Sequence, residues 1–168
     1  RFNISGNVYN TDGNYFPVSG CVDPNGSTIY IGLSKPKKYA DPVVSSSVIL
    51  KDADFTAGTA SKATRIYYDQ STQNGEIITD MVATSGYLYC SAVRAGNFTT
   101  SDDSFLLLMH TDKSTETTTL TVKTSDTHML QGLQVMDIGA GTAPTQKIFY
   151  QVPERGMMAY VNDSAASQ

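Results

Sequence analysis

Residues 15–33 read YFPVSGCV, DPNG and STIYIGL, and they carry the clearest local signal in the chain. The outer two segments are rich in Val, Ile and Tyr, which suit a half-buried pleated surface. In the turn Asp23–Gly26, Pro presets the backbone and Gly supplies the positive φ that closes the chain on itself. The stretch therefore predicts two antiparallel strands joined by a tight turn. Pro17 lacks a backbone donor, so we expect its strand to lie at a sheet edge or to contain a bulge.

The same alternation of apolar and polar residues, interrupted by turn residues, extends along the rest of the chain. The Asn-Gly pair at 74–75 predicts a hairpin between the segments 64–69 and 76–82. In the segment 117–124 we expect Leu120 and Val122 to be buried. Further strands are expected at 47–51, 87–93, 105–110, 130–138, 146–152 and 157–161. The segment 52–63 is the one place where a helical turn is plausible.

About ten short strands with little or no helix predict an all-β fold. No long segment with a 3.6-residue period exists to cover a parallel sheet. We therefore expect an antiparallel β-sandwich of two facing sheets, with a jelly roll as one form of it. The length of 168 residues fits a single domain. We place that domain at 1–162 and a mobile polar tail at 163–168.

The composition argues against several classes of partner. The formal net charge is −4, and the densest basic run, Lys35 to Lys38, contains a proline. Nucleic-acid binding needs clustered basic residues, so we expect no nucleic-acid partner. The longest apolar run, Phe105 to Met109, is far too short to span a bilayer. The chain starts at Arg1, which we interpret as a processed product or an excised fragment.

The two cysteines, Cys21 and Cys90, are too far apart in sequence to form a metal-binding pair of the Cys-x-x-Cys type. A disulfide between them would close a long loop and stabilise the fold by roughly 4 kcal/mol in the chain-entropy model. In a reducing compartment both would instead be small buried hydrophobes. The sequence leaves these two alternatives open.

Residues that could support catalysis are sparse. His110 stands near Asp112, and His128 stands near Asp126. Two such groups do not make a triad or a closed metal shell. No nucleophile elbow or phosphate-binding loop is present in the sequence. We therefore expect no enzyme activity, no cofactor and no bound metal.

Two sets of residues suggest surface roles. Asn-x-Ser/Thr triplets predict N-glycosylation sites, and turn chemistry or chance is the alternative explanation. They begin at Asn3, Asn25, Asn97 and Asn162. Tyr67, Tyr87 and Tyr89 could form a binding surface, because tyrosine joins a flat apolar ring to a polar tip. Cross-strand packing within the sheets is the alternative that we favour for them.

These features together favour a structural or assembly subunit, either of a virion (capsid or projection domain) or of an extracellular filament. Such a subunit would act through contacts with copies of itself, at a virion surface or outside the cell. Phe2, Ile4 and Val8 alternate with polar residues and could donate a strand to the open edge of a neighbour. The alternative is an adhesion module that binds a glycan or a cell-surface receptor through loops at one end of the sandwich.

Overall fold

The fold was examined in a computed structural model of the chain. It describes residues 15–24, 26, 28–35, 46–52, 64–68, 76–94, 104–110, 117, 120–126, 128–138 and 145–164. Within them the chain forms eleven β-strands and one short 3-10 turn, η2 (Pro153–Arg155). The expectation of a nearly all-β chain is confirmed.

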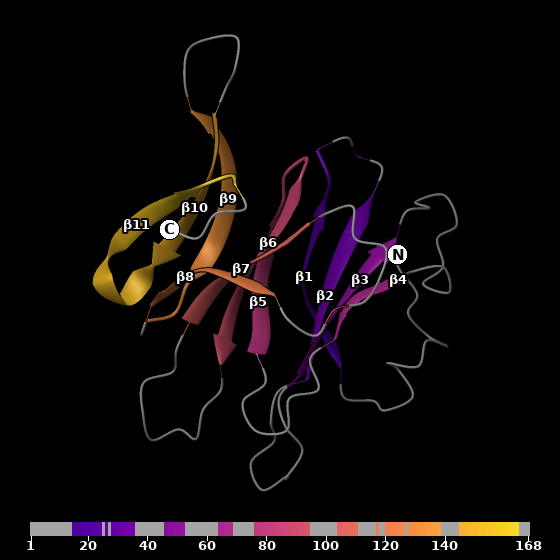
Figure 1. Cartoon of the computed structure of the whole chain (residues 1–168). Helices are drawn as coiled ribbons and strands as arrows, with labels where there is room; N and C mark the ends of the chain where they lie inside the picture. Colours follow the sequence, from indigo (N-terminus) through magenta and orange to yellow (C-terminus); the bar gives the residue numbers. More distant parts are fainter. Residues whose placement is uncertain are drawn as a thin grey trace, which may run out of the picture.

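The strands form three antiparallel sheets in which consecutive strands are neighbours (Figure 1). The first sheet contains β1 (Phe16–Val22), β2 (Ile29–Lys35), β3 (Ser46–Asp52) and β4 (Thr64–Tyr68). The second contains β5 (Glu76–Ala83), β6 (Tyr87–Arg94), β7 (Ser104–His110) and β8 (Thr121–Asp126). The third contains β9 (Gln131–Ile138), β10 (Thr145–Val152) and β11 (Met157–Asn162). The number of sheets is three where the sequence predicted two. The order of the described strands is a meander, whereas a jelly roll requires Greek-key order.

The predicted β1–β2 hairpin is present and has the expected turn. The Gly26 N–H donates to the Asp23 carbonyl at 2.9 Å, and Gly26 has a φ of 71°. β1 is an edge strand of the first sheet, and its register with β2 shifts between Pro17 and Ser19. The interpretation of Pro17 as a mark of an edge or a bulge is therefore confirmed, since both are found.

The second sheet lies between the other two, as Figure 1 shows, and its strand β6 is buried on both faces. Leu88, Cys90 and Ala92 point into one hydrophobic cluster with residues of β2, β3 and β4. Tyr89 points the opposite way, into a second cluster with residues of the third sheet. These two clusters therefore depend on the second sheet, whereas a third cluster, of Leu33, Val48 and Leu50, lies within the first sheet.

Serine hydroxyls bind the backbone of β5 to the first sheet. Ser34 Oγ donates to the Ile78 carbonyl at 3.1 Å, and the Ile78 N–H donates to Ser47 Oγ at 3.0 Å. Pairing with β6 places β5 in the second sheet, and the serine contacts join that strand to the first sheet. The predicted hairpin between 64–69 and 76–82 is consequently wrong, because β4 and β5 belong to different sheets.

The residues that are buried in and just before β8 also differ from those predicted. Leu120 is buried as expected, but Val122 is exposed and Lys123 is buried instead. The register of β7 and β8 pairs Leu107 with Val122 and Leu106 with Thr124. Lys123 is therefore the extra residue of a bulge between Val122 and Thr124.

Candidate functional site

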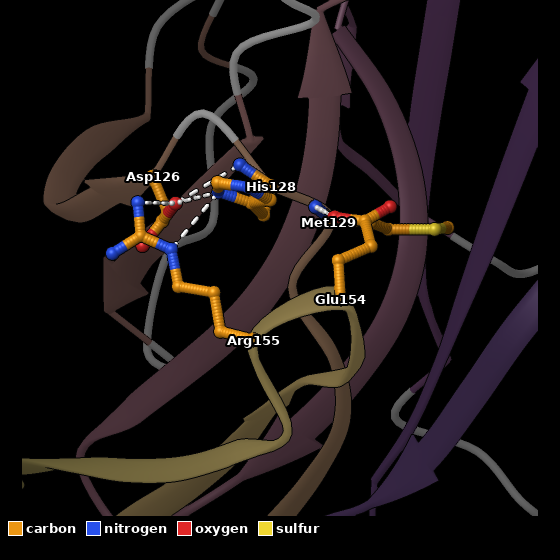
Figure 2. A network of polar contacts seen from close by, with 5 residues as sticks. All are labelled: Asp126, His128, Met129, Glu154 and Arg155. Carbon is orange, nitrogen blue, oxygen red and sulfur yellow. Dashed lines mark hydrogen bonds and ion pairs between the residues drawn. The ribbon is translucent and has the colours of Figure 1, made fainter.

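A polar cluster joins the β8–β9 turn to η2 (Figure 2). Asp126 Oδ1 accepts hydrogen bonds from the His128 backbone N–H at 2.9 Å and lies 3.0 Å from His128 Nδ1. Arg155 Nη2 lies 3.2 Å from the same oxygen, and Arg155 Nε–H donates to His128 Nδ1 at 3.0 Å. The β8–β9 turn is thus bound to Arg155 of η2, which directly precedes β11.

Protonation decides which of these contacts His128 Nδ1 can make. A neutral Nδ1 with a lone pair accepts from Arg155, whereas a protonated Nδ1 donates to Asp126. The hydrogen bonds from the His128 side chain and backbone lower the pKa of Asp126, and the charge of Arg155 acts in the same direction. The carboxylate of Asp126 therefore stays ionised to a lower pH than an ordinary aspartate.

Glu154 supplies a further contact between the same two turns. Its carboxylate accepts a hydrogen bond from the Met129 N–H at 3.2 Å (Figure 2). The cluster thus contains two carboxylates, an imidazole and a guanidinium, but no hydroxyl or thiol nucleophile among its labelled members. The contacts of the cluster hold the β8–β9 turn against η2, so the cluster positions these two segments. The sequence indicated the pair of His128 and Asp126, but the contribution of Arg155 depends on the fold.

A second cluster anchors the end of β11 on the second sheet. Asp163 Oδ1 accepts hydrogen bonds from Tyr89 Oη–H at 2.7 Å and from Thr84 Oγ1–H at 3.2 Å. Lys123 Nζ donates to the Ser164 carbonyl at 2.7 Å. Burial lowers the pKa of Lys123, although the charge of Asp163 opposes that effect. Asp163 and Ser164, which the sequence assigned to a mobile tail, are instead hydrogen-bonded to the second sheet.

The outer face of the third sheet carries exposed apolar side chains. Phe149 is opposite Tyr160 and Lys147 is opposite Met136, so these residues form adjacent cross-strand rows. Tyr160 packs on Phe149 with 5.5 Å between ring centroids, and Lys147 Nζ lies 3.8 Å from the Tyr160 centroid. Five apolar residues of this face define what we call the outer patch: Met136, Ile138, Phe149, Met158 and Tyr160. Each of these residues lies in a predicted strand. That they share one face of one sheet could not be inferred without the register of the strands.

The predicted tyrosine surface does not form. Tyr67 and Tyr89 are 1% and 0% exposed and belong to the two core clusters, and Tyr87 is partly buried against Tyr89. Burial and the hydrogen bond to Asp163 raise the pKa of Tyr89 far above its ordinary value. These rings therefore pack within the fold, which is the alternative that we favoured from the sequence.

Cys21 and Cys90 are free thiols that meet the same core cluster. Burial raises the pKa of Cys21 to about 12, with a smaller contribution from Asp80. Burial also raises the pKa of Cys90, and the neighbouring Cys21 adds to that effect. Both side chains are therefore protonated thiols at neutral pH, and thiols react much more slowly than thiolates. A disulfide between the two stays a prediction.

Other predicted surface residues fall mostly outside the described residues. These are Phe2, Ile4 and Val8 of the strand-donation hypothesis, and Asn3, Asn25 and Asn97 of the sequons. Asp112 and the side chain of His110 are outside them too, as is the segment 53–63. Asn162 is described and is exposed on β11, and its glycosylation stays a prediction.

No family model, curated protein or solved structure matches the chain. A search limited to the described residues finds no group of three or more His, Cys, Asp or Glu side chains arranged to hold a metal. The same part of the chain contains no helix long and apolar enough to cross a membrane.

Proposed function

We propose that this chain is a structural or assembly subunit, of a virion or of an extracellular filament, which acts through contacts with other copies of itself. The observation that carries the proposal is the outer patch. Met136, Met158 and Tyr160 are 41%, 60% and 51% exposed on one face of the third sheet. Scattered exposed hydrophobic residues are common, but a continuous group of them is typical of a protein interface.

The register supports the continuity of this group. Met136 and Ile138 are two residues apart on β9, and Met158 and Tyr160 are two residues apart on β11. Side chains two residues apart in a strand point to the same face. Phe149 on β10 lies between the two strands and contacts Tyr160. Apolar side chains therefore recur on this face of all three strands, where Gln134 is opposite Phe149 and Lys147 is opposite Met136.

The composition of the patch suits protein contacts. Methionine is flexible and adapts to an irregular partner surface, and tyrosine is enriched in the centres of interfaces. The adhesion alternative uses loops at one end of the sandwich, and of the tyrosines that could have added a binding surface, Tyr67 and Tyr89 are buried and Tyr87 is half-buried. The assembly proposal is therefore the better supported of the two.

Negative-stain electron microscopy of the native protein over a concentration series tests the proposal. We expect regular particles, shells or fibres whose abundance rises with concentration. Grids without any regular assembly at the highest concentrations would overturn it.

A further inference from the structure

The edge of β11 is built differently from every other sheet edge in the described part of the chain. Sheet edges expose unpaired N–H and C=O groups, and proteins protect them with charges, prolines, bulges or covering groups. β11 carries the sequence MMAYVN, which has no charged residue and no proline. Its register with β10 runs without a shift from Met157 to Asn162. A regular and uncharged edge of this kind is suited to pairing with another strand.

The edges of the first sheet are protected. β1 contains Pro17 and a register shift, and Ser19 on β1 accepts a hydrogen bond from the Met81 N–H. β4 is covered at its centre, where the Thr117 N–H donates to the Ile66 carbonyl at 3.1 Å. A bridge between Tyr67 and Thr117 lies at the same point.

The edges of the second sheet and the far edge of the third are protected as well. Serine hydroxyls bind both backbone groups of Ile78 on β5. β8 is bulged at Lys123. On β9, the Leu133 N–H donates to Asp80 Oδ2 at 2.9 Å, and Gly132 takes a φ of 66°. Within the described residues, β11 alone lacks such a device.

One hydrogen bond reveals which backbone groups of β11 face its free edge. The Asp163 N–H donates to the Gln146 carbonyl at 3.1 Å, in the register that pairs Asn162 with Lys147. Hydrogen-bonded and non-hydrogen-bonded pairs alternate along an antiparallel ladder. Met158, Tyr160 and Asn162 therefore direct their N–H and C=O groups away from β10.

We propose that β11 pairs antiparallel with β11 of a second copy, about a two-fold axis at Tyr160. This inference rests on the proposed assembly function, and it names the strand edge through which two copies would pair. The register centred on Tyr160 pairs Met158 with Asn162 of the other copy, so that all three outward-facing residues find partners. It places no like charges opposite one another, because the strand carries none.

Pairing at this edge also joins the two outer patches. Met158 and Tyr160 share a face with Phe149, so a continuous sheet across the two-fold axis would bring both patches onto one surface. Each of the three outward-facing residues would exchange two backbone hydrogen bonds with its partner in the other copy. The backbone thus supplies the register, and the side chains of Tyr160 meet across the axis.

Charge variants at the axis test this register. Tyr160→Glu and Tyr160→Lys each place like charges directly opposite in a pair of identical copies, and an equimolar mixture places opposite charges there. Size-exclusion chromatography with light scattering would follow the wild type, each variant and the mixture. We expect each variant to dissociate at concentrations at least about tenfold above those needed for the wild type, with association regained in the mixture.

The controls separate this pairing from other contacts. Ser125→Glu places the same charge on an exposed position of β8, away from both the outer patch and β11, and it should associate like the wild type. Ile4→Lys tests strand donation by the N-terminal segment, and it too should associate normally. Circular dichroism verifies that each variant is folded.

The outcomes distinguish the inference from the proposed function. If the wild type associates and both Tyr160 variants associate equally well, or if only Ile4→Lys is defective, the β11 pairing is wrong while the assembly proposal survives. If the mixture of Tyr160 variants fails to associate although each is folded, the register is wrong. A wild type that never associates would overturn the proposed function itself.

Discussion

Asp80 on β5 and Leu133 on β9 join the second sheet to the third through a hydrogen bond of 2.9 Å from the Leu133 N–H to Asp80 Oδ2. The other carboxylate oxygen, Oδ1, accepts from Ser19 Oγ–H of the first sheet at 3.1 Å and from the Met81 N–H at 2.8 Å. One side chain thus contacts all three sheets. The Asp80 carboxylate also gives the Leu133 N–H a hydrogen-bond acceptor at the edge of β9, where no neighbouring strand pairs with it.

Replacing this carboxylate should destabilise the whole fold. Asp80→Ala leaves the Leu133 N–H and Ser19 without their acceptor, and an unsatisfied buried polar group costs about 1–3 kcal/mol. We expect the free energy of unfolding, measured by urea denaturation, to fall by about that amount. Asp137→Ala removes an exposed carboxylate from β9 and is the matched control. Equal stability of the two variants would contradict the role of Asp80.

Gly32 on β2 should not tolerate a side chain. A Cβ atom there would lie 3.1 Å from Met81 Sδ and 3.3 Å from Met81 Cε, within the core between the first two sheets. Gly32→Ala should therefore lower the free energy of unfolding by about 1–3 kcal/mol through overpacking. Gly86→Ala is the control, since a Cβ at that position meets nothing within 4 Å. Its stability should change by less than about 1 kcal/mol.

Alkaline pH should weaken the fold through its buried thiols. The folded pKa of Cys21 is about 12, compared with an ordinary value of 9.0. Because the folded state holds this proton more tightly, the stability that it contributes is complete below pH 9.0 and is lost as the pH rises toward 12. The folded pKa of Cys90 is raised in the same direction. In urea denaturation between pH 8 and 11, Cys21→Ala should lose stability less steeply than the wild type. Parallel pH profiles would contradict this account.

Local patterns predicted the strands well, because alternation and turn residues act over a few neighbours. The Asp23–Gly26 turn and the edge position of Pro17 are examples. The contacts that assign strands to sheets are nonlocal, and the hydrogen bonds of Ser34 and Ser47 to Ile78 left no sequence signal that we recognised. This is why β4 and β5 were predicted to form a hairpin and why a third sheet was not foreseen.

The candidate site was harder to predict than the fold. The sequence brought His128 and Asp126 together because they are two residues apart, but Arg155 joins them only through the pairing of β10 with β9 and β11. Val122 was expected to be buried, but it is exposed, and Lys123 beside it is buried next to a one-residue shift of register. Exposure on the outer patch likewise depends on which face each strand presents, which alternation alone does not decide.

The molar mass of the wild-type protein in solution, measured by light scattering across a wide concentration range, tests the central claim of self-assembly most directly. The account predicts a mass above the 18.1 kDa of a single chain that increases with concentration. A mass that stays at 18.1 kDa up to the highest concentration would contradict it.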